Sequence, residues 1–483
     1  MHPAPSIISL RKSATLLLTL GLAACAAYVP HPLDTHSHRI GVDAIQVSPE
    51  AMPLPALRTH RFDPGDGLDM TETAMLAVAN NPDLRVARDA VGIARAQAFA
   101  AGLLPDPQLS LSADHPSGNI AGSNTNAFGL GLSYDINALL RRSAEHASAR
   151  AAQTRGEQEL LWQEWQVVAQ ARLLFVRSVE GERLLALLEH QRALFVDRQA
   201  RLRRAFDDGN VTVDAVATDY AALQGVEQKK RDTQRTLAKN RHDLNNLLGL
   251  DPGIQLRLVG DDAPLHVDAT RVRALLQQLP EIRPDLRALA AGYSSQDEKY
   301  RAAVVAQFPM MSIGFNHARD TSGIYTTGFG LSLSLPIFNG NRGNIAIEKV
   351  TRQRLYDDYQ ARLAAATAEI EVILDDRALA REQLAAAQAS VAGLHDLSAH
   401  SQAAYSAGGI DVLTYANQRD ALLSAQMEVL KLEQALREQE IGLQGLLGSA
   451  LPADATDTPA AGDPEPGTAA PMTTTPTKVE QAR

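Results

Sequence analysis

The strongest constraint on the fold of this chain is that its second half repeats its first. Asn81-Pro82-Asp83-Leu84-Arg85 recurs 202 residues later as Arg283-Pro284-Asp285-Leu286-Arg287. Each copy is about 200 residues long, far longer than the unit of a solenoid. The sequence therefore predicts a duplication, with repeat 1 over 68–260 and repeat 2 over 261–449. Three further matches follow in the same order at nearly the same offset: Gly129–Ser133 with Gly330–Ser334, Phe206–Val211 with Tyr405–Ile410, and Asn246–Gly249 with Gly445–Gly448.

Each copy contains two short segments in which apolar residues alternate with small or polar ones. They are 108–115 and 127–135 in repeat 1, and 310–317 and 326–336 in repeat 2. Alternation with a period of two is typical of a strand with one apolar face. A membrane β-barrel shows this pattern because its apolar face meets lipid. A soluble sheet with one buried face shows it equally, so the strand pattern alone leaves both open.

The number of strands limits how such a sheet could cross a membrane. Known membrane barrels start at about eight strands, so the four predicted here cannot close one. An open edge in lipid would leave backbone groups unpaired at several kcal/mol each. If these strands span a membrane, several copies of the chain must share one barrel.

The remainder of each copy predicts long helices. Segment 144–205 contains no proline, and at 1.5 Å per residue it would extend roughly 90 Å. Two stripes with coiled-coil spacing, apolar except at Arg172, run along it. They suggest a wall of helices with neighbours on both sides, although a simple antiparallel hairpin remains an alternative. The stripes consist of Leu161, Trp165, Val168, Arg172, Phe175 and Val179, and of Leu160, Val167, Ala171 and Leu174.

Both copies then follow the same order of elements. A helix precedes each strand pair, and a helical hairpin follows it. Prolines after the first helix of each copy end that helix. The predicted helices are 71–101, 144–205 and 213–248 in repeat 1, and 284–305, 345–405 and 412–447 in repeat 2.

The N-terminus carries an export signal. Arg11 and Lys12 precede a short apolar run, which predicts a secretory signal peptide over 1–24. The run is too short to span a bilayer. Leu22-Ala23-Ala24-Cys25 resembles a bacterial lipobox, which implies cleavage before Cys25 and a covalent lipid such as palmitate on it. An ordinary signal peptide with an incidental cysteine is the alternative.

The residues around Cys25 bear on location. Ala26 follows it. The lipoprotein sorting pattern keeps proteins in the inner membrane mainly when aspartate stands at this position, so Ala26 implies delivery to the outer membrane. An outer-membrane location favours the barrel interpretation of the strands. Cys25 is the only cysteine, so no intrachain disulfide can form. One acyl chain is a weak anchor, so a second membrane element is expected.

The two ends of the mature chain lie outside the repeats. Segment 25–67 is predicted to be a lipidated linker. The tail 450–483, rich in Pro, Ala and Thr, is predicted to be disordered.

Composition and motifs exclude several classes of function. The formal net charge is −10, and without a basic tract nucleic-acid binding is not expected. No GxSxG, HExxH or P-loop pattern occurs, so an enzyme is not predicted, and no cofactor other than the lipid on Cys25 is expected. His31, His36 and His38 cluster in the linker, where nothing rigid would hold a metal, so no metal site is predicted.

Together, the signal, duplication, strand pairs and hairpins resemble the TolC-like outer-membrane efflux proteins, over about 68–448. Ala79–Leu84 resembles the opening motif of that family, and Leu335–Gly343 its strand-exit motif. The resemblance implies a mainly α fold with a transmembrane β portion, in which a homotrimer forms an α-barrel of coiled-coil hairpins and a shared 12-stranded β-barrel. It also implies a passive duct in the outer membrane that works with a periplasmic adaptor and an inner-membrane pump. A lipid-anchored periplasmic scaffold or adaptor is the alternative.

The resemblance also implies two functional sites at the hairpin turns. The turns would contact the adaptor, although a glycine there also simply ends a helix. Asp411, and its counterpart Asp214, would line a periplasmic gate; the second acid of the family falls at Thr414 here, and capping of the next helix is the alternative role for either aspartate. The predicted adaptor-contact residues are Gly209, Asn210 and Val211 in repeat 1, and Gly408, Gly409 and Ile410 in repeat 2.

Overall fold

The computed structural model describes residues 28–35, 39, 41, 47–52, 54–117, 125–260 and 267–448. The chain divides into two units, Met1–Ile40 and Gly41–Arg483. In the first unit, the described residues form no helix or strand. The predicted signal peptide, Cys25 and the predicted C-terminal tail lie outside the described residues.

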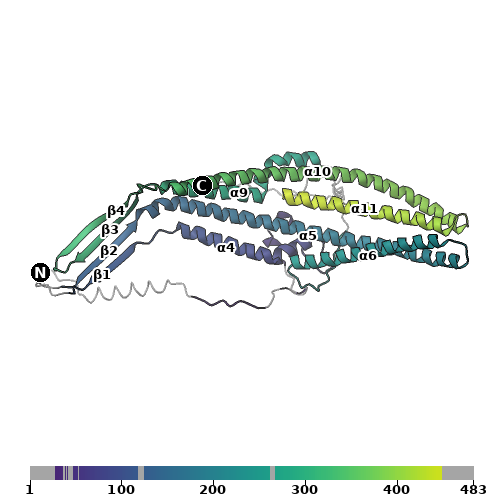
Figure 1. Cartoon of the computed structure of the whole chain (residues 1–483), viewed down its shortest axis with the longest axis horizontal. Coiled ribbons are helices and arrows are strands. Elements are labelled where there is room, and N and C mark those ends of the chain that lie inside the picture. Colours follow the sequence, from purple (N-terminus) through teal and green to yellow (C-terminus); the bar gives the residue numbers. More distant parts are fainter. Residues whose placement is uncertain are drawn as a thin grey trace, which may run out of the picture. The chain divides into compact units, whose positions relative to one another are not determined.

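In the second unit, four strands form one antiparallel sheet in the order β1-β2-β3-β4 (Figure 1). Because β2 pairs with β3, the sheet joins the two copies of the repeat. The outer edges of β1 and β4 have no strand partner among the described residues. The strands are β1 (Gln108–Asp114), β2 (Ala127–Asp135), β3 (Met310–Arg319) and β4 (Tyr325–Ser334).

The second strand pair differs from its predicted bounds. The prediction ended the first strand of the pair at residue 317, but β3 continues to Arg319, which pairs with Phe128 on one side and Tyr325 on the other. The prediction ended the second strand at 336, but β4 ends at Ser334. Pro336 has no backbone N–H for the ladder, and such residues sit at strand ends or edges.

The first predicted helix, 71–101, is in fact two helices. Helix α3 (Met70–Asn80) and helix α4 (Pro82–Gly102) meet at Asn81, whose φ of −54° and ψ of 125° are not helical. The Asn81 side chain accepts a hydrogen bond from the Leu84 N–H and donates one to the Leu247 carbonyl at 2.9 Å. The prediction of one continuous helix was wrong because Pro82 is the first residue of a new helix, a position that proline favours.

The remaining helices form the body of the unit. Short helices come before β1 and between the copies, whereas the long ones form two hairpins, α5 with α6 and α10 with α11 (Figure 1). The long helices are α5 (Ile136–Asp207), α6 (Val213–Leu247), α9 (Pro284–Val305), α10 (Arg342–Ser406) and α11 (Val412–Leu447). The short ones are η2 (Pro49–Ala51), α2 (Pro55–Arg58), α7 (Ala269–Leu275), η3 (Leu276–Gln278) and α8 (Leu279–Ile282).

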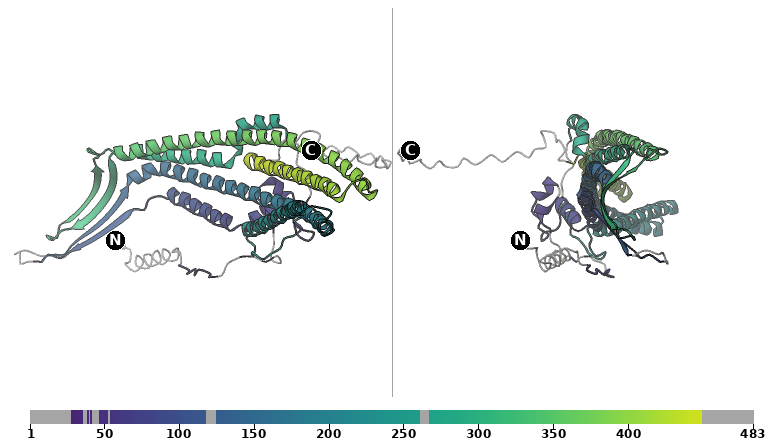
Figure 2. Two further views of the ribbon diagram at one scale, coloured as in Figure 1. Left: turned by 45° about the vertical axis from the view of Figure 1, so that its right-hand side comes forward. Right: turned by 90° about the vertical axis from the view of Figure 1, so that its left-hand side faces the viewer.

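Helix α5 is the centre of a helical wall. It packs against α4, α6, α9 and α11, and α10 packs against α9 and α11 (Figures 1 and 2). Both predicted stripes of α5 are used: Val168 and Phe175 of the first and Ala171 and Leu174 of the second are buried. The wall of helices with neighbours on both sides is thereby confirmed, and the single-hairpin alternative is wrong.

The apolar core is a series of small clusters along these helices. One joins α9, α10 and α11 around Leu286, Ile370 and Leu443, and another joins α5 to α11 through Phe175 and Ile441. This is the pattern expected of extended helical packing, in which each contact serves only neighbouring helices. Of the described helices, none combines the length and apolar content needed to cross a bilayer.

Candidate functional site

The two hairpin turns lie together at the end of the unit that is far from the sheet (Figure 1). Gly209 and Gly408 have φ of 77° and 74°, a left-handed conformation that glycine adopts without strain. The Asn210 N–H donates to the Ala205 carbonyl at 2.8 Å, closing the end of α5. The Gly409 N–H closes the end of α10 in the same way at 2.8 Å. Each glycine thus ends its helix.

The predicted adaptor-contact residues are accessible in this chain. Gly209, Asn210, Gly408 and Gly409 are exposed, while Val211 and Ile410 are partly buried. Apolar side chains of the following helices flank them, since Val213 and Leu413 are also exposed. The turns therefore offer small backbone-rich surfaces with an apolar margin. Adaptor contact at these residues stays a prediction.

Asp411 is the N-cap of α11. Its carboxylate accepts a hydrogen bond from the Thr414 N–H at 2.7 Å and another from the Thr414 hydroxyl at 3.2 Å. These bonds to the charged form lower the pKa of Asp411, with the backbone bond from Thr414 as the largest cause. The capping alternative therefore holds for Asp411. It does not exclude a gate role, because Asp411 remains exposed to solvent.

Asp214 differs from Asp411 although the repeat aligns them. It lies in the first turn of α6, where Thr212 is the cap and accepts from the Ala215 N–H at 3.4 Å. Asp214 is exposed. A carboxylate in a first helical turn is still favoured by the helix dipole. Capping is thus not the role of Asp214, and its part in a gate stays a prediction.

A set of polar bonds near the turns ties the first hairpin to the second. Arg198 on α5 is buried and pairs with Asp219 on α6. Its Nη1 also donates to the Asn417 side-chain oxygen on α11 at 3.0 Å. Arg201, one turn further, donates to the Tyr405 hydroxyl on α10 at 2.8 Å. We call these five residues the hairpin tie.

The hairpin tie was missed from the sequence, but a signal for it exists. Phe195, Arg198 and Leu202 follow the spacing of a buried stripe, and all three are buried. An arginine at such a position needs a partner on a facing helix, because unpaired charges are rarely buried. The spacing could have predicted that Arg198 is buried and paired, but it could not have predicted which helix supplies the partner. Gln191 on α5 and Asp420 on α11 add a further bond across the same seam.

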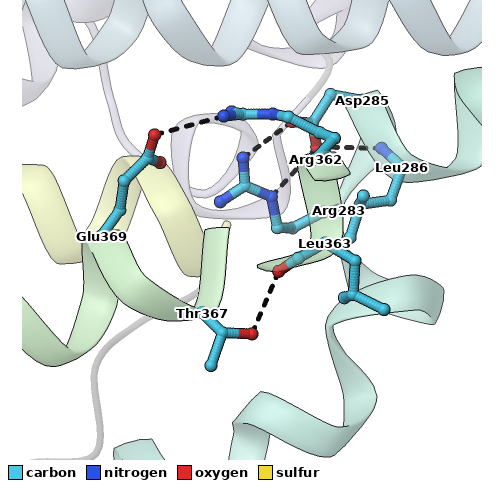
Figure 3. Close-up of polar contacts among 7 residues, drawn as sticks. All are labelled: Arg283, Asp285, Leu286, Arg362, Leu363, Thr367 and Glu369. Atoms are coloured by element: carbon cyan, nitrogen blue, oxygen red, sulfur yellow. Dashed lines mark hydrogen bonds and ion pairs between the residues drawn. The ribbon is translucent and has the colours of Figure 1, made fainter. Parts of the chain in front are cut away.

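A second polar cluster joins α9 to α10 within repeat 2 (Figure 3). Arg283 is fully buried and donates from Nε and Nη2 to the two oxygens of Asp285, at 3.0 and 2.7 Å. Arg362 on α10 donates to Asp285 at 2.7 Å and to Glu369 at 3.2 Å. The Arg283 guanidinium also lies 4.8 Å from the Trp162 ring of α5, a cation–π distance.

This cluster explains why the repeated motif differs between the copies. Asn81 opens the first motif and caps α4, whereas Arg283 opens the second, pairs with Asp285 of α9 and lies over Trp162 of α5. Burial alone would raise the pKa of Asp285, but the hydrogen bonds from Arg283 and Arg362 outweigh it and lower that pKa. Asp285 is therefore a structural carboxylate that stays ionised at neutral pH.

A metal ion needs several ligand side chains held close together. Among the described residues, no group of three or more His, Cys, Asp or Glu side chains is placed to hold a metal ion. Of the histidines noted in the linker, His31 is described and exposed. His36 and His38 lie outside the described residues.

This chain is similar in sequence to known outer-membrane efflux proteins. Residues 275–449 match the sequence model of a family described as "Outer membrane efflux protein". The cation efflux system protein CusC of Escherichia coli K12 is 24% identical over 388 residues, covering 77% of this chain and 84% of CusC.

Solved structures agree on the fold. The outer-membrane channel OprN superposes with a TM-score of 0.66 at 16% identity, covering 88% of this chain and 99% of OprN. The CmeC outer membrane channel of Campylobacter jejuni superposes with a TM-score of 0.65 at 18% identity, covering 88% of this chain and 95% of CmeC. The sheet and helical wall described above are thus the fold of these channels.

Proposed function

We infer that this chain is a member of the outer membrane efflux protein family and the outer-membrane channel subunit of a tripartite efflux pump, as its similarity to that family's sequence model, to CusC and to the solved channels supports. The observation that carries this conclusion is the four-stranded sheet with one apolar face, continuous with a helical wall that ends in two hairpin turns. The sheet lies in the outer membrane, and the helices extend into the periplasm. The channel is a passive duct for exported solutes.

We propose that three copies assemble into the channel. Both edge strands lack a partner among the described residues, and unpaired backbone in lipid is costly. A closed barrel of three chains would contain twelve strands and leave no edge. This assembly rests on the open edges and on the family fold.

The helices at the two margins of the wall near the sheet support the same assembly. Among the described elements, helix α4 packs mainly on α5, and α10 packs mainly on α9 and α11. Each margin exposes apolar side chains on one face of its helix: Val86 and Ile93 on α4, and Ile347 and Val350 on α10. Exposed faces of this kind mark protein contacts. We propose that α4 of one copy packs on α10 of the next.

The hairpin turns are the proposed site of adaptor binding. They lie at the end far from the sheet, and the membrane sheet at the other end places them deep in the periplasm. An adaptor bound there would connect the channel to an inner-membrane pump, which would supply the energy. The residues proposed to make this contact are Gly209, Asn210, Val211, Gly408, Gly409 and Ile410.

The same end is the proposed gate. In a trimer, Asp411 and Asp214 would each occur three times around the entrance, and rings of acids favour cations. The hairpin tie holds both hairpins of one chain together. We propose that the entrance opens only when these cross-hairpin bonds break.

Cargo and lipid attachment belong to the same proposal. The relative CusC is described as a cation efflux protein, which makes metal cations the first cargo class to test. A covalent lipid on Cys25 would anchor the linker to the outer-membrane lipid. No further cofactor, no nucleic acid and no catalysis are part of the proposal.

The rival reading, a lipid-anchored periplasmic scaffold, is tested by Cys25→Ala. A channel subunit held by its own strands should stay in the membrane fraction after an alkaline wash, with or without the lipid. A scaffold held only by its lipid should become soluble. Soluble, folded Cys25→Ala protein would contradict the channel.

A further inference from the structure

The apolar face of the sheet carries a single charged side chain, Arg319. Paired residues across the four strands define this face, and among its described residues it holds no Asp or Glu. The acids of the strands, Asp114 and Asp135, lie on the opposite, small and polar face. The apolar face consists of Leu109, Leu111, Ala113, Phe128, Leu130, Leu132, Tyr134, Met311, Ile313, Phe315, His317, Arg319, Tyr325, Thr327, Phe329, Leu331 and Leu333.

The position of Arg319 on its strand places it at the edge of the membrane. Strand β3 has 10 residues, and Arg319 is the last. At about 3.4 Å per residue and a tilt of about 40°, such a strand rises roughly 26 Å. The apolar band of a membrane barrel is about 25 Å tall, and an arginine on its lipid face costs least at the margins. Arg319 therefore lies at the level of the lipid headgroups, given that this sheet lies in the outer membrane.

Aromatic rings and a backbone carbonyl hold the Arg319 guanidinium in place. Its Nη2 and Nε donate to the Asn126 carbonyl at 2.6 and 3.2 Å. Its central carbon lies 5.8 Å from the Phe128 ring centre and 5.9 Å from that of Tyr325, within cation–π range. Among the described residues no contact involves Nη1. An oriented guanidinium thus keeps hydrogen-bond donors for another molecule.

His317 extends the same surface. Its ring stacks on Tyr325 with centres 6.0 Å apart, and its Nδ1 lies 2.7 Å from the Thr327 hydroxyl oxygen. Its Nε2 makes no contact with the described residues. Tyr325 is 60% exposed, so the cluster is open on the side that faces away from the barrel.

Among the described residues, no carboxylate forms an ion pair with Arg319. Asp320, the next residue, accepts hydrogen bonds from the Ser322 and Ile324 N–H groups, both at 2.9 Å. Its carboxylate thus caps the β3–β4 turn, and it forms no ion pair with Arg319. A cation at the rim of an apolar face is complementary to a molecule that carries an anionic group on an apolar body.

We propose that Arg319, His317 and Tyr325 bind the phosphate group of a lipid in the membrane leaflet at this rim. The planar guanidinium matches the geometry of a phosphate, and the acyl chains of such a lipid would cover the apolar face below it. A free phosphate ion could bind the guanidinium but could not cover the apolar face. Repeat 1 has no equivalent arginine, because Ser117 stands where the offset of 202 residues aligns Arg319. The channel would therefore carry one site per chain.

The test measures lipid retained by the detergent-purified, full-length oligomer. The protein is incubated with lipid A or with lipid A whose phosphates have been removed, then washed, and bound lipid is counted by native mass spectrometry. Wild-type protein should retain the phosphorylated form about tenfold more strongly, the factor expected for a hydrogen bond to a charged group. Arg319→Gln should abolish this preference, and Arg319→Lys should restore part of it. Inorganic phosphate alone should not compete at the same concentration.

Arg301→Gln is the matched control, because Arg301 is an exposed arginine on α9. It should behave as wild type. Equal retention of both lipids by the wild type, or an unchanged preference in Arg319→Gln, would overturn the inference. Competition by inorganic phosphate would also overturn it, since it would show an ion site rather than a lipid site. Conductance of the same wild-type preparation tests the channel separately: a conducting oligomer without the lipid preference leaves the proposed function standing.

Discussion

Asp411 has two roles at the level of single residues, and substitution can separate them. It caps α11 through Thr414, and it is a candidate for the charge ring of the gate. Asparagine caps a helix about as well as aspartate, whereas alanine costs about 1 kcal/mol. Asp411→Asn therefore tests the charge alone, whereas Asp411→Ala tests the charge and the helix cap together.

We expect Asp411→Asn to lower the preference of the channel for cations, because the charge is lost while the cap remains. Asp411→Ala should lower it equally and also raise the conductance, because the first turn of α11 loosens. Both are measured as reversal potential and conductance in planar bilayers. Asp214→Asn tests the charge of the other turn in the same way. If neither Asp411 variant differs from wild type, Asp411 has no part in the gate.

Asp285 is a residue whose charge supports the fold. Its pKa is lowered in the folded chain by Arg283 and Arg362, so its stabilising effect is complete above the unfolded pKa of about 3.9 and is lost as pH falls through the folded value. Asp285→Ala should destabilise the protein by about 3 kcal/mol at pH 7, because it leaves Arg283 buried without its partner.

This prediction is checked by thermal unfolding, followed by circular dichroism between pH 3 and pH 7. The stability lost in Asp285→Ala should become smaller toward pH 3, because there Asp285 of the wild type is protonated and its ion pairs are lost as well. Asp297→Asn is the control: its partner Arg352 is on the surface, and exposed pairs contribute about 1 kcal/mol or less. A loss in Asp285→Ala no larger than in Asp297→Asn would refute the structural role.

At the level of elements, periodicity predicted the long helices and strands well. The predicted helices 284–305 and 412–447 match α9 and α11. A periodic pattern that extends over many turns still predicts a helix when single residues deviate from it. The break at Asn81 was missed, since a proline inside an apolar pattern can kink a helix or start a new one. The contacts of Arg283 with Trp162 and of Arg198 with Asn417 were also missed. They join residues far apart in sequence, and only the packing of helices brings them together.

The hairpin tie makes a prediction about α5 and α11. Asn417→Ala removes the bond from Arg198 to the second hairpin and leaves the Arg198–Asp219 pair intact. One hydrogen bond to a charged group is worth about 1.5 kcal/mol, so the open entrance should become roughly tenfold more populated. Single-channel recording measures this as open probability.

Gln434→Ala is the matched control for this variant. Its amide also lies on α11 but bonds within the helix, to Glu438. It should leave the open probability unchanged. An open probability of Asn417→Ala equal to that of Gln434→Ala would show that the hairpin tie does not hold the entrance closed.

At the level of the whole molecule, the edge strands of the sheet and the marginal helices α4 and α10 are proposed to contact further copies of the chain. We expect Ile93→Asp to prevent assembly, because it places a charge in the apolar contact proposed between α4 of one copy and α10 of the next. Ile93→Leu keeps the apolar side chain and should assemble normally. Mass measurement in detergent distinguishes the two. A trimer of Ile93→Asp as stable as that of Ile93→Leu would exclude α4 from the contact between copies.

The central claim is that copies of this chain share one membrane channel. The most direct test is the mass of the detergent-purified oligomer together with its conductance in a planar bilayer. We expect a particle of three chains that produces stepwise changes in conductance. A monomeric particle without conductance would contradict it.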